Sequence, residues 1–443
     1  MTHSSNKQRL LMAALGIAIL GQCIAVAWSM RPGMAGDSPS YLLLAHNLGL
    51  GHYGELTSNG WAPDPLRPPG YPLLLWLLNG TLHLPLAAIV GLQVAAYLAS
   101  LLLVERLLPT GWIRIIFRCL VLAYPFGVAY ASNIMTEAWV MLCFAIASSL
   151  LVSPSQDRWR FAAVGGSLGA AILLRSDMLL LPVMLAVLLV VLNRKQGLWP
   201  ALAKPLIMLA AVAAVLTPYA LWNKANFGRM SPVPFAAAVG NSLYTASWQE
   251  ELALDDFNQF YGGKITPRLV QSGYLAQVIA LNRSIGAPEL TPPDNPVKYP
   301  SLETRIASNR VFGAAAIDRI KANPLHYARH VLRNVWLLWN SSNYGPNIPP
   351  LVRAALMACS YAVFLLGIAG LFSTVLNRAG GSKALVLASV LLYPFAVHLP
   401  AHLEARYTSS SRPLLLLFAA LGAAWIIRQI FGAPIDPARQ RPL

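Results

Sequence analysis

The residues best suited to chemistry stand just outside apolar segments of membrane length. Asp37 follows the first such segment, and Arg67 precedes Pro68-Pro69-Gly70-Tyr71-Pro72, a run that restricts the backbone. A carboxylate accepts a proton from a hydroxyl if nearby apolar surface raises its pKa, and a guanidinium binds phosphate oxygens in pairs while staying charged. This pair predicts chemistry on an anionic, lipid-borne substrate. The alternative is that Asp37 only caps a helix expected over 40–48.

A second group of ionisable residues lies where a later apolar segment begins. Glu137 starts that segment, and Arg175 and Asp177 lie at the next turn on the same side. An ionisable side chain at the edge of a membrane segment usually faces a cavity or a partner. We therefore expect Arg175 and Asp177 to be the partners of Glu137. Two plainer readings stay open, a first-turn glutamate favoured by the helix dipole and a structural ion pair.

A third group lies before the last apolar segment. Arg406, Tyr407 and Arg412 stand beside a membrane entrance. Two guanidiniums and a phenol suit a phosphate there, because each guanidinium offers a planar fork of donors to its oxygens. The alternative is that Glu404 and Arg406 only anchor the helix end at the interface.

The other ligand-type residues form no metal or disulfide pattern. His398 and His402 are four residues apart, as two ligands on one helix face would be, but the sequence offers no third ligand. The four cysteines lie inside apolar runs and form no CxxC pair. No Walker loop or HExxH motif is present, which argues against ATP-driven and zinc-protease functions. We expect no required cofactor, and a divalent metal is possible but not indicated.

The composition requires a membrane around these residues. The chain has 443 residues, of which 56% are hydrophobic and only 11% are charged, with a mean hydropathy of +0.54. This is more apolar surface than the core of a soluble domain can bury, so we expect a polytopic membrane protein. The net charge of +16 is spread over short loops between apolar runs. It therefore indicates membrane orientation and not nucleic-acid binding.

Hydropathy predicts about ten membrane-spanning helices, over 10–29, 84–108, 115–132, 135–152, 161–175, 178–193, 198–222, 351–376, 384–402 and 413–430. The alternative for the first is a cleaved signal peptide, because 25–27 reads Ala-Val-Ala. Loops rich in Lys and Arg alternate along the chain, and the positive-inside rule places them in the cytoplasm. Asp37, Arg67, Glu137, Arg175 and the segment 398–412 then share the outer face.

The spans divide the chain into three predicted modules. A transmembrane module over 1–222 contains a catalytic first outer loop over 30–75, an outer-face domain follows over 223–350, and a second transmembrane module covers 351–443. Helices are predicted over 305–321 and 324–339, and the second carries His326, His330 and Arg333 at helical spacing. It reads as an interfacial helix. Gly165 and Gly169 form a GxxxG motif, which predicts helix packing.

In their order along the chain, these motifs resemble the GT-C superfamily of integral-membrane glycosyltransferases, in the style of its aminoarabinose transferase and protein O-mannosyltransferase branches. The resemblance covers nearly the full length. Its carriers are Gly36-Asp37-Ser38 with Tyr41, Arg67-Pro68-Pro69-Gly70-Tyr71-Pro72, Thr136-Glu137, Leu174-Arg175-Ser176-Asp177, Asn323-Pro324-Leu325-His326-Tyr327 and Glu404-Ala405-Arg406-Tyr407.

The resemblance implies an all-α GT-C fold, with interfacial helices in the first outer loop and a small, mainly helical outer domain. It also implies a polyprenyl-phosphate sugar donor, inversion at the anomeric carbon, and an active site on the periplasmic or outer face of a bacterial inner membrane. The acceptor would be a hydroxyl of a lipid, glycan or protein, with membrane lipids as further partners and no nucleic acid.

The residues themselves and the resemblance together predict roles for eleven residues, and the resemblance implies those of Asp37, Arg67 and Arg406. The catalytic residues are Asp37, as general base, and Glu137. Residues for the donor phosphate are Arg67, Arg406, Tyr407 and Arg412, and further substrate-binding residues are Tyr41, Tyr71, Arg175, Asp177 and Glu404. Two departures bear on this assignment. Many relatives have two adjacent acidic residues where this chain has Asp37-Ser38, and they often have Arg-Pro-Glu where it has Arg175-Ser176-Asp177.

Two other functions are compatible with the sequence. A flippase or transporter for lipid-linked glycans would carry its charges near mid-bilayer and would show repeats, which are not apparent here. A glycan polymerase or ligase with a diphosphate-linked donor would need more phosphate ligands than one arginine pair, and Arg175 or Arg412 would have to supply them. The second alternative stays open.

Overall fold

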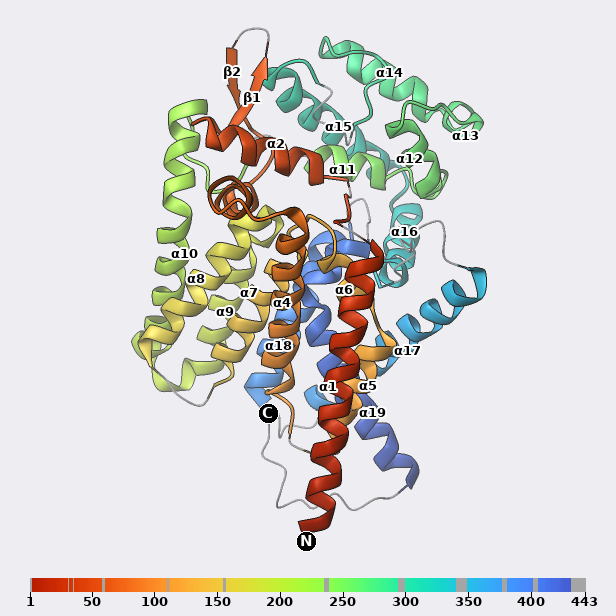
Figure 1. The fold of residues 1–443 in the computed structure, drawn as a ribbon. Coiled ribbons are helices and arrows are strands. Elements are labelled where there is room, and N and C mark those ends of the chain that lie inside the picture. Colours follow the sequence, from red (N-terminus) through yellow and green to blue (C-terminus); the bar gives the residue numbers. More distant parts are fainter. Residues whose placement is uncertain are drawn as a thin grey trace.

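The computed structural model describes residues 2–30, 32–34, 36–57, 60–109, 111–153, 157–234, 239–293, 299–339, 349–376, 381–400 and 405–431. Long apolar helices make up its lower part in Figure 1, and shorter helices cover their upper end. The polytopic, mainly helical architecture predicted from composition is confirmed.

Seven of the described helices are long and apolar enough to cross a membrane. They are α1 (Thr2–Met30), α4 (Leu86–Glu105), α9 (Leu181–Asn193) with the 3-10 turns η2 (Ser176–Met178) and η3 (Arg194–Gln196) on either side, α10 (Leu198–Phe227), α17 (Pro350–Leu376), α18 (Gly381–His398) and α19 (Arg412–Phe431) with η5 (Ala405–Ser411) before it. The predicted spans 135–152 and 161–175 correspond to the shorter helices α7 (Glu137–Leu151) and α8 (Arg158–Leu174).

The predicted span over 115–132 is wrong as a single helix. It is divided into α5 (Trp112–Ala123) and α6 (Phe126–Ala131), with the break at Tyr124 and Pro125. A residue before proline is disfavoured in the helical region, and Tyr124 accordingly has φ −129° and ψ 73°. The break lets α6 end beside the end of α1, close to the charged residues described below.

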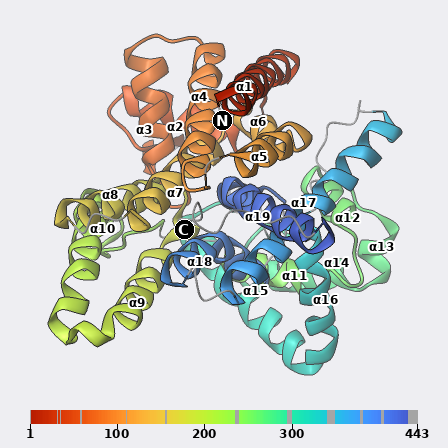
Figure 2. The same cartoon turned by 90° about the horizontal axis from the view of Figure 1, so that it is seen from below.

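Helix α7 occupies the centre of the bundle. It packs against α4, α8, α18, α19 and η5, and Figure 2 shows it between the groups formed by these helices. Gly165 and Gly169 of α8 face α10 so closely that an added Cβ would collide with Met208 or Val215. The GxxxG motif is therefore a packing face, as predicted.

The first loop between α1 and α4 contains more structure than the sequence predicted. Helix α2 (Ser38–Gly49) covers the expected 40–48 and is followed by an antiparallel hairpin of β1 (Gly54–Thr57) and β2 (Gly60–Pro63), with Leu56 opposite Trp61. Helix α3 (Gly70–Leu75) and a π-helical turn, η1 (Trp76–Thr81), lead into α4. The hairpin was not predicted, although Asn-Gly at 59–60 is a strong hairpin signal.

Six helices, called the cap from here on, lie over one side of the bundle (Figure 1). They are α11 (Val239–Ala246), α12 (Leu254–Tyr261), α13 (Pro267–Gln271), α14 (Tyr274–Ser284), α15 (Leu302–Ala322) and α16 (Pro324–Leu337). The helices predicted over 305–321 and 324–339 are thus present as α15 and α16. The cap has its own apolar core around Tyr274, Phe257 and Phe312, separate from the core of the bundle.

Side chains fix the start of each long cap helix. The Ser301 hydroxyl accepts a hydrogen bond from the Thr304 N–H at the start of α15, and Asn323 Oδ1 accepts one from the His326 N–H at the start of α16. The polar face of α16 turns toward the rest of the cap, where Arg333 donates to the Gln249 carbonyl at 2.6 Å. Its apolar residues Leu325 and Leu332 are exposed, and the interfacial position of this helix stays a prediction.

Candidate active site

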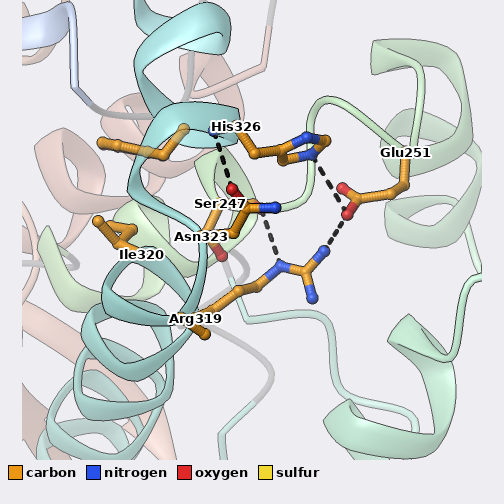
Figure 3. A pocket seen from close by; sticks show the side chains of 8 residues that line it. Ser247, Glu251, Arg319, Ile320, Asn323 and His326 are labelled. Atoms are coloured by element: carbon orange, nitrogen blue, oxygen red, sulfur yellow. Dashed lines mark hydrogen bonds and ion pairs between the residues drawn. The ribbon is translucent and has the colours of Figure 1, made fainter.

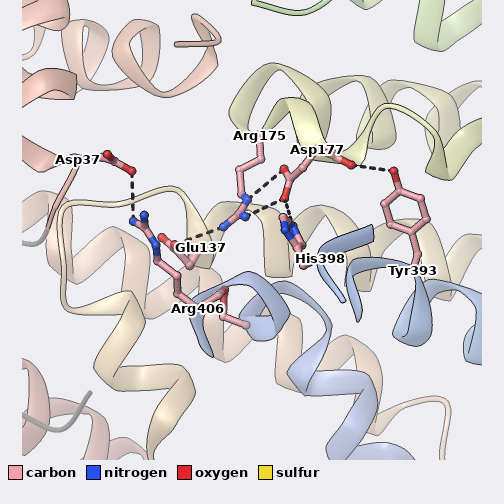
Figure 4. A network of polar contacts seen from close by, with 8 residues as sticks. Asp37, Glu137, Arg175, Asp177, Tyr393, His398 and Arg406 are labelled. Carbon is pink, nitrogen blue, oxygen red and sulfur yellow. Dashed lines mark hydrogen bonds and ion pairs between the residues drawn. The ribbon is translucent and has the colours of Figure 1, made fainter. Parts of the chain in front are cut away.

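Three carboxylates and three guanidiniums gather where helices of the bundle begin or end, and Figure 4 labels all of them except Arg67. We call them the charged cluster: Asp37 and Arg67 in the first loop, Glu137 as the first residue of α7, Arg175 after α8, Asp177 in η2 and Arg406 in η5. They come from five separate parts of the chain. Because α7 is central in the bundle, its first residue lies at the point where these parts meet.

Asp37 is held by two arginines, one on each carboxylate oxygen. Arg67 Nη2 donates to Oδ1 at 2.6 Å, and Arg406 Nη1 donates to Oδ2 at 3.2 Å. The Asp37 side chain is 21% exposed, so it can still be reached from outside. Although Asp37 stands at the N-cap position of α2, its side chain makes no capping hydrogen bond. The plain capping reading of Asp37 is therefore wrong.

The electrostatics of Asp37 also differ from expectation. Burial acts to raise the pKa of Asp37, but the charges of Arg67 and Arg406 and their hydrogen bonds outweigh it and hold the pKa below its ordinary value. The sequence-based condition for a base was a raised pKa, and in this arrangement that condition is not met. The carboxylate becomes basic only if the two guanidiniums move to another anion.

Arg67 is fixed through its own backbone. Asp64 Oδ1 accepts hydrogen bonds from the N–H groups of Leu66 and Arg67 at 2.6 and 2.8 Å, and the hydroxyls of Tyr53 and Tyr219 both donate to the Arg67 carbonyl, at 2.8 and 3.3 Å. Burial acts to lower the pKa of Arg67, but the neighbouring Asp37 charge raises it above the ordinary value. The guanidinium is thus a fixed, permanent charge at the edge of the first loop.

The other half of the cluster is built around Arg175. Its Nη2 and Nε donate to the two oxygens of Asp177 at 2.8 and 3.3 Å, and its Nη1 lies 3.5 Å from Glu137 Oε1. The predicted partnership of Glu137 with Arg175 is confirmed. Glu137 is only 1% exposed, and its Oε2 has no hydrogen-bond partner among the described residues. A buried carboxylate oxygen without a partner is costly, and it is typical of a group that meets a ligand.

Helix α18 and the turn η5 hold this half in place. His398 Nε2 lies 2.7 Å from Asp177 Oδ2, and the Tyr393 hydroxyl donates to the Asp177 carbonyl at 2.7 Å. The His398 ring stacks on Tyr407 at 4.3 Å. The guanidiniums of Arg175 and Arg406 lie 5.5 and 5.6 Å from the centre of the same Tyr407 ring, so this ring joins the two halves of the cluster.

Two glycines let the first loop approach the bundle. Gly33 exchanges backbone hydrogen bonds with Ser132 and Ile134 at 3.1 and 2.9 Å, and an added Cβ there would collide with Asn133. At Gly70, where α3 begins, an added Cβ would lie 2.5 Å from the Leu173 carbonyl oxygen of α8. These contacts place Asp37 and Arg67 opposite Glu137 and Arg175.

The remaining predicted site residues have different surroundings. The Tyr41 ring lies 5.6 Å from the Arg67 guanidinium, within the site. Tyr71 is fully buried and its hydroxyl donates to Gln93 at 2.6 Å, so it supports the Tyr41 ring, which it meets edge-on at 5.0 Å. Glu404 and His402 lie outside the described residues.

Arg412 is not brought to the cluster. It is 1% exposed, donates to the Tyr124 hydroxyl and lies against the rings of Phe126 and Trp339, at 5.3 and 6.0 Å. It therefore holds α19 against the break between α5 and α6. Its predicted phosphate contact has no support from this placement.

Sequence reasoning missed three residues that shape the site. His398 was considered only as a metal ligand, and Tyr393 and Asp64 were not considered. Of these three, only Asp64 could have been selected from the sequence, because carboxylates are few in this chain. Within the described ranges no group of three or more His, Cys, Asp and Glu side chains is placed to hold a metal ion.

A polar hollow of about 190 Å³ lies in the cap, between α16 and the end of α11 (Figure 3). Glu251 pairs there with Arg319 and lies 3.5 Å from His326 Nε2, while Arg319 Nε donates to the Ser247 carbonyl at 2.9 Å. Its charged groups are thus engaged with one another. They join α15 and α16 to the segment that follows α11.

No family model and no curated protein sequence matches this chain. Among solved structures, it resembles the oligosaccharyltransferase AglB from Archaeoglobus fulgidus in complex with an inhibitory peptide and a dolichol-phosphate, with a TM-score of 0.52 and 12% identity over 98% of this chain and 53% of AglB. A second structure of that enzyme, tethered to an acceptor peptide, gives 0.53 and 13% over 99% and 53%. The chain thus spans about half the length of these structures.

ArnT from Cupriavidus metallidurans, bound to undecaprenyl phosphate, matches over 96% of this chain and 80% of its own, with 14% identity and a TM-score of 0.37. That score is too low to bear on the fold. The AglB structures do bear on it, since they match nearly every part of the chain in one arrangement. The chain therefore has the mainly helical, polytopic GT-C fold of the matched half of these structures.

Proposed function

We propose that this protein is an inverting glycosyltransferase that moves a sugar from a polyprenyl-phosphate donor to a hydroxyl acceptor at the outer face of the membrane. One observation carries the proposal. Arg67 and Arg406 each donate to one oxygen of Asp37, so two guanidiniums from distant parts of the chain converge on one anionic oxygen pair. A phosphate presents the same kind of oxygen pair to such donors.

In the proposed reaction, the donor phosphate takes the place that the Asp37 carboxylate holds between Arg67 and Arg406. Once the guanidiniums of Arg67 and Arg406 bind the phosphate and no longer contact Asp37, the effect of burial on the pKa of Asp37 prevails and that pKa rises. Donor binding therefore turns Asp37 into a general base. This exchange explains how one residue can be paired with arginines in this structure and still accept a proton during transfer.

The transfer step then balances as follows. The acceptor hydroxyl oxygen attacks the anomeric carbon from the side opposite the phosphate, its proton passes to Asp37, and the bond between the anomeric carbon and the phosphate oxygen breaks. Polyprenyl phosphate leaves with the bonding electrons, which Arg67 and Arg406 stabilise. The proposed role of Glu137, whose Oε2 has no hydrogen-bond partner in the described part of the chain, is to bind a hydroxyl of the transferred sugar.

A monophosphate donor is favoured over a diphosphate donor by the charges that are available. Arg175 already faces two carboxylates, Asp177 and Glu137, and Arg412 is buried among aromatic rings. The arginines that the diphosphate alternative requires are thus engaged elsewhere. The placement of the cluster at the ends of the long apolar helices, and not near their middle, likewise favours a transferase over a transporter, whose sites lie near the bilayer midplane.

Two further parts of the proposal concern the surroundings of the site. We place the cap and the first loop on the periplasmic side of a bacterial inner membrane, because the Lys- and Arg-rich loops lie at the opposite end. The solved AglB complex contains dolichol-phosphate and a peptide, which supports a polyprenyl-phosphate ligand for a chain of this fold. The acceptor of this chain is proposed only as a hydroxyl.

The test uses the purified protein in detergent with a panel of polyprenyl-phosphate sugars, and it follows the release of free polyprenyl phosphate. We expect release from at least one donor, with full activity in Asp318→Asn, which changes an exposed carboxylate of α15. If no member of the panel is bound, as measured by competition with undecaprenyl phosphate, the proposed function is contradicted.

A further inference from the structure

The two halves of the charged cluster carry opposite net charges. Asp37 faces Arg67 and Arg406, two positive charges for one negative. Arg175 faces Asp177 and Glu137, one positive charge for two negative. A donor phosphodiester that binds to Arg67 and Arg406 adds one negative charge. The Arg175 half then holds an uncompensated negative charge next to the new anion.

His398 is placed to supply the missing positive charge. Its Nε2 lies 2.7 Å from Asp177 Oδ2, its side chain is 12% exposed, and it is the last residue of α18, where the helix dipole favours a cation. A histidine is the side chain whose charge ordinarily changes between about pH 5 and 8. Stacking on Tyr407 also places its ring against the aromatic ring that both Arg175 and Arg406 contact.

We propose that His398 is a positioning residue whose protonation is coupled to donor binding: the protonated ring neutralises Asp177, so that the Arg175 half of the cluster no longer presents a net negative charge to the incoming phosphate. This inference rests on the proposed function and adds a proton to the donor-binding step. His398 does not touch the reacting atoms. It acts through Asp177, which it holds in the bidentate contact with Arg175.

Other titratable and charged groups face this position from the elements packed around it. Those that the contacts connect to His398 are Asp177 in η2 with Arg175 before it, Glu137 on α7, Arg406 and Tyr407 in η5, and Tyr393 on α18 itself. Arg412 on α19 lies among aromatic rings instead. The arginines keep their charge throughout. Protonation of one of the carboxylates would also make donor binding depend on pH, so the experiment must distinguish it from protonation of His398.

The proposed coupling predicts the direction in which donor affinity changes with pH. Donor binding favours the protonated histidine, so affinity is high at low pH and falls as pH rises and the ring loses its proton. The probe is the methyl ester of undecaprenyl phosphate, a phosphodiester with no ionisation of its own between about pH 5 and 8. Its dissociation constant is measured by isothermal titration calorimetry on the full chain in detergent. We expect binding about tenfold weaker at about pH 8.5 than at about pH 5.5.

Three variants test whether His398 is the group that takes up the proton when the donor binds. His398→Gln keeps a hydrogen-bonding side chain without the charge, and it should bind weakly and equally at both pH values. His398→Lys keeps a charge throughout and should bind tightly at both. His46→Gln, at an exposed position of α2, should keep the wild-type pH dependence. A wild-type protein without pH dependence, or a His398→Gln variant that retains it, overturns the inference while leaving the proposed function intact. Failure to bind at any pH would instead count against the proposed function.

Discussion

At the scale of single residues, the two arginine contacts of Asp37 affect stability as well as chemistry. Burial raises the pKa of Asp37, but Arg67 and Arg406 lower it further than burial raises it. A carboxyl group whose pKa is lowered on folding stabilises the protein above its unfolded pKa of about 3.9, and this contribution is lost as pH falls below that value. We expect the apparent Tm of the wild type in detergent to fall more steeply below about pH 4 than that of Asp37→Asn. Parallel slopes for the two proteins would contradict the lowered pKa.

Arg67 permits a second test at this scale. Its guanidinium makes a charge-assisted hydrogen bond to Asp37 now and, in the proposed reaction, to the donor phosphate. Loss of one such bond costs about 1–3 kcal/mol, so Arg67→Ala should weaken binding of undecaprenyl phosphate about 10- to 100-fold. Arg283→Ala is the matched control, because Arg283 forms an exposed ion pair with Glu289 at 2.7 Å on the surface of the cap. Equal affinities for Arg67→Ala and the control would exclude Arg67 from the phosphate site.

Asp37, Arg67, Glu137, Arg175, Asp177 and Arg406 could be selected from the sequence because charge is scarce in this chain and each stands at the edge of an apolar run. Their pairing could not be selected. Which of Arg67, Arg406 and Arg412 faces Asp37 depends on how η5 and α19 pack, and Arg412 turns into an aromatic site instead. The role of His398 depends on its contact with Asp177, which lies 221 positions earlier in the chain.

At the scale of elements, the close approach of α3 to α8 positions Arg67 opposite Arg175. A Cβ at Gly70 would lie 2.5 Å from the Leu173 carbonyl oxygen and 3.0 Å from the Leu173 Cβ, and backbone cannot move aside cheaply. We expect Gly70→Ala to lower both the apparent Tm and the transfer rate. Gly91→Ala is the control, because nothing lies within 4 Å of a Cβ at that position of α4. It should stabilise the helix by about 0.5–1 kcal/mol. Full activity in Gly70→Ala would show that this contact does not set the site geometry.

Periodicity and composition were sufficient to predict most helices of the bundle and the two long helices of the cap. They failed where a local signal was overlooked in favour of a hydropathy average. The span 115–132 contains Pro125, which ends α5, and the stretch 54–63 contains an Asn-Gly pair between two short extended segments. In both places the prediction relied on hydropathy and overlooked the residues that determine the backbone conformation.

At the scale of the whole molecule, the proposed orientation can be tested independently of chemistry. The cap and the first loop should face outward, and the turn between α9 and α10 should face the cytoplasm. In a variant whose four cysteines are replaced by alanine, a single cysteine at the exposed Lys264 should react with a membrane-impermeant maleimide in intact cells. A single cysteine at the exposed Lys195 should react only after permeabilisation. The reverse pattern would invert the topology and place the charged cluster in the cytoplasm.

The measurement that tests the central claim most directly compares wild type and Asp37→Asn in two assays on the same preparations: release of polyprenyl phosphate from a donor that the wild type uses, and the dissociation constant for undecaprenyl phosphate. If Asp37 occupies the phosphate position before the donor binds and becomes the base when the donor displaces it, the variant should bind undecaprenyl phosphate at least as tightly as the wild type and release nothing. Sustained release by Asp37→Asn, or a loss of its affinity for the phosphate, would contradict the account.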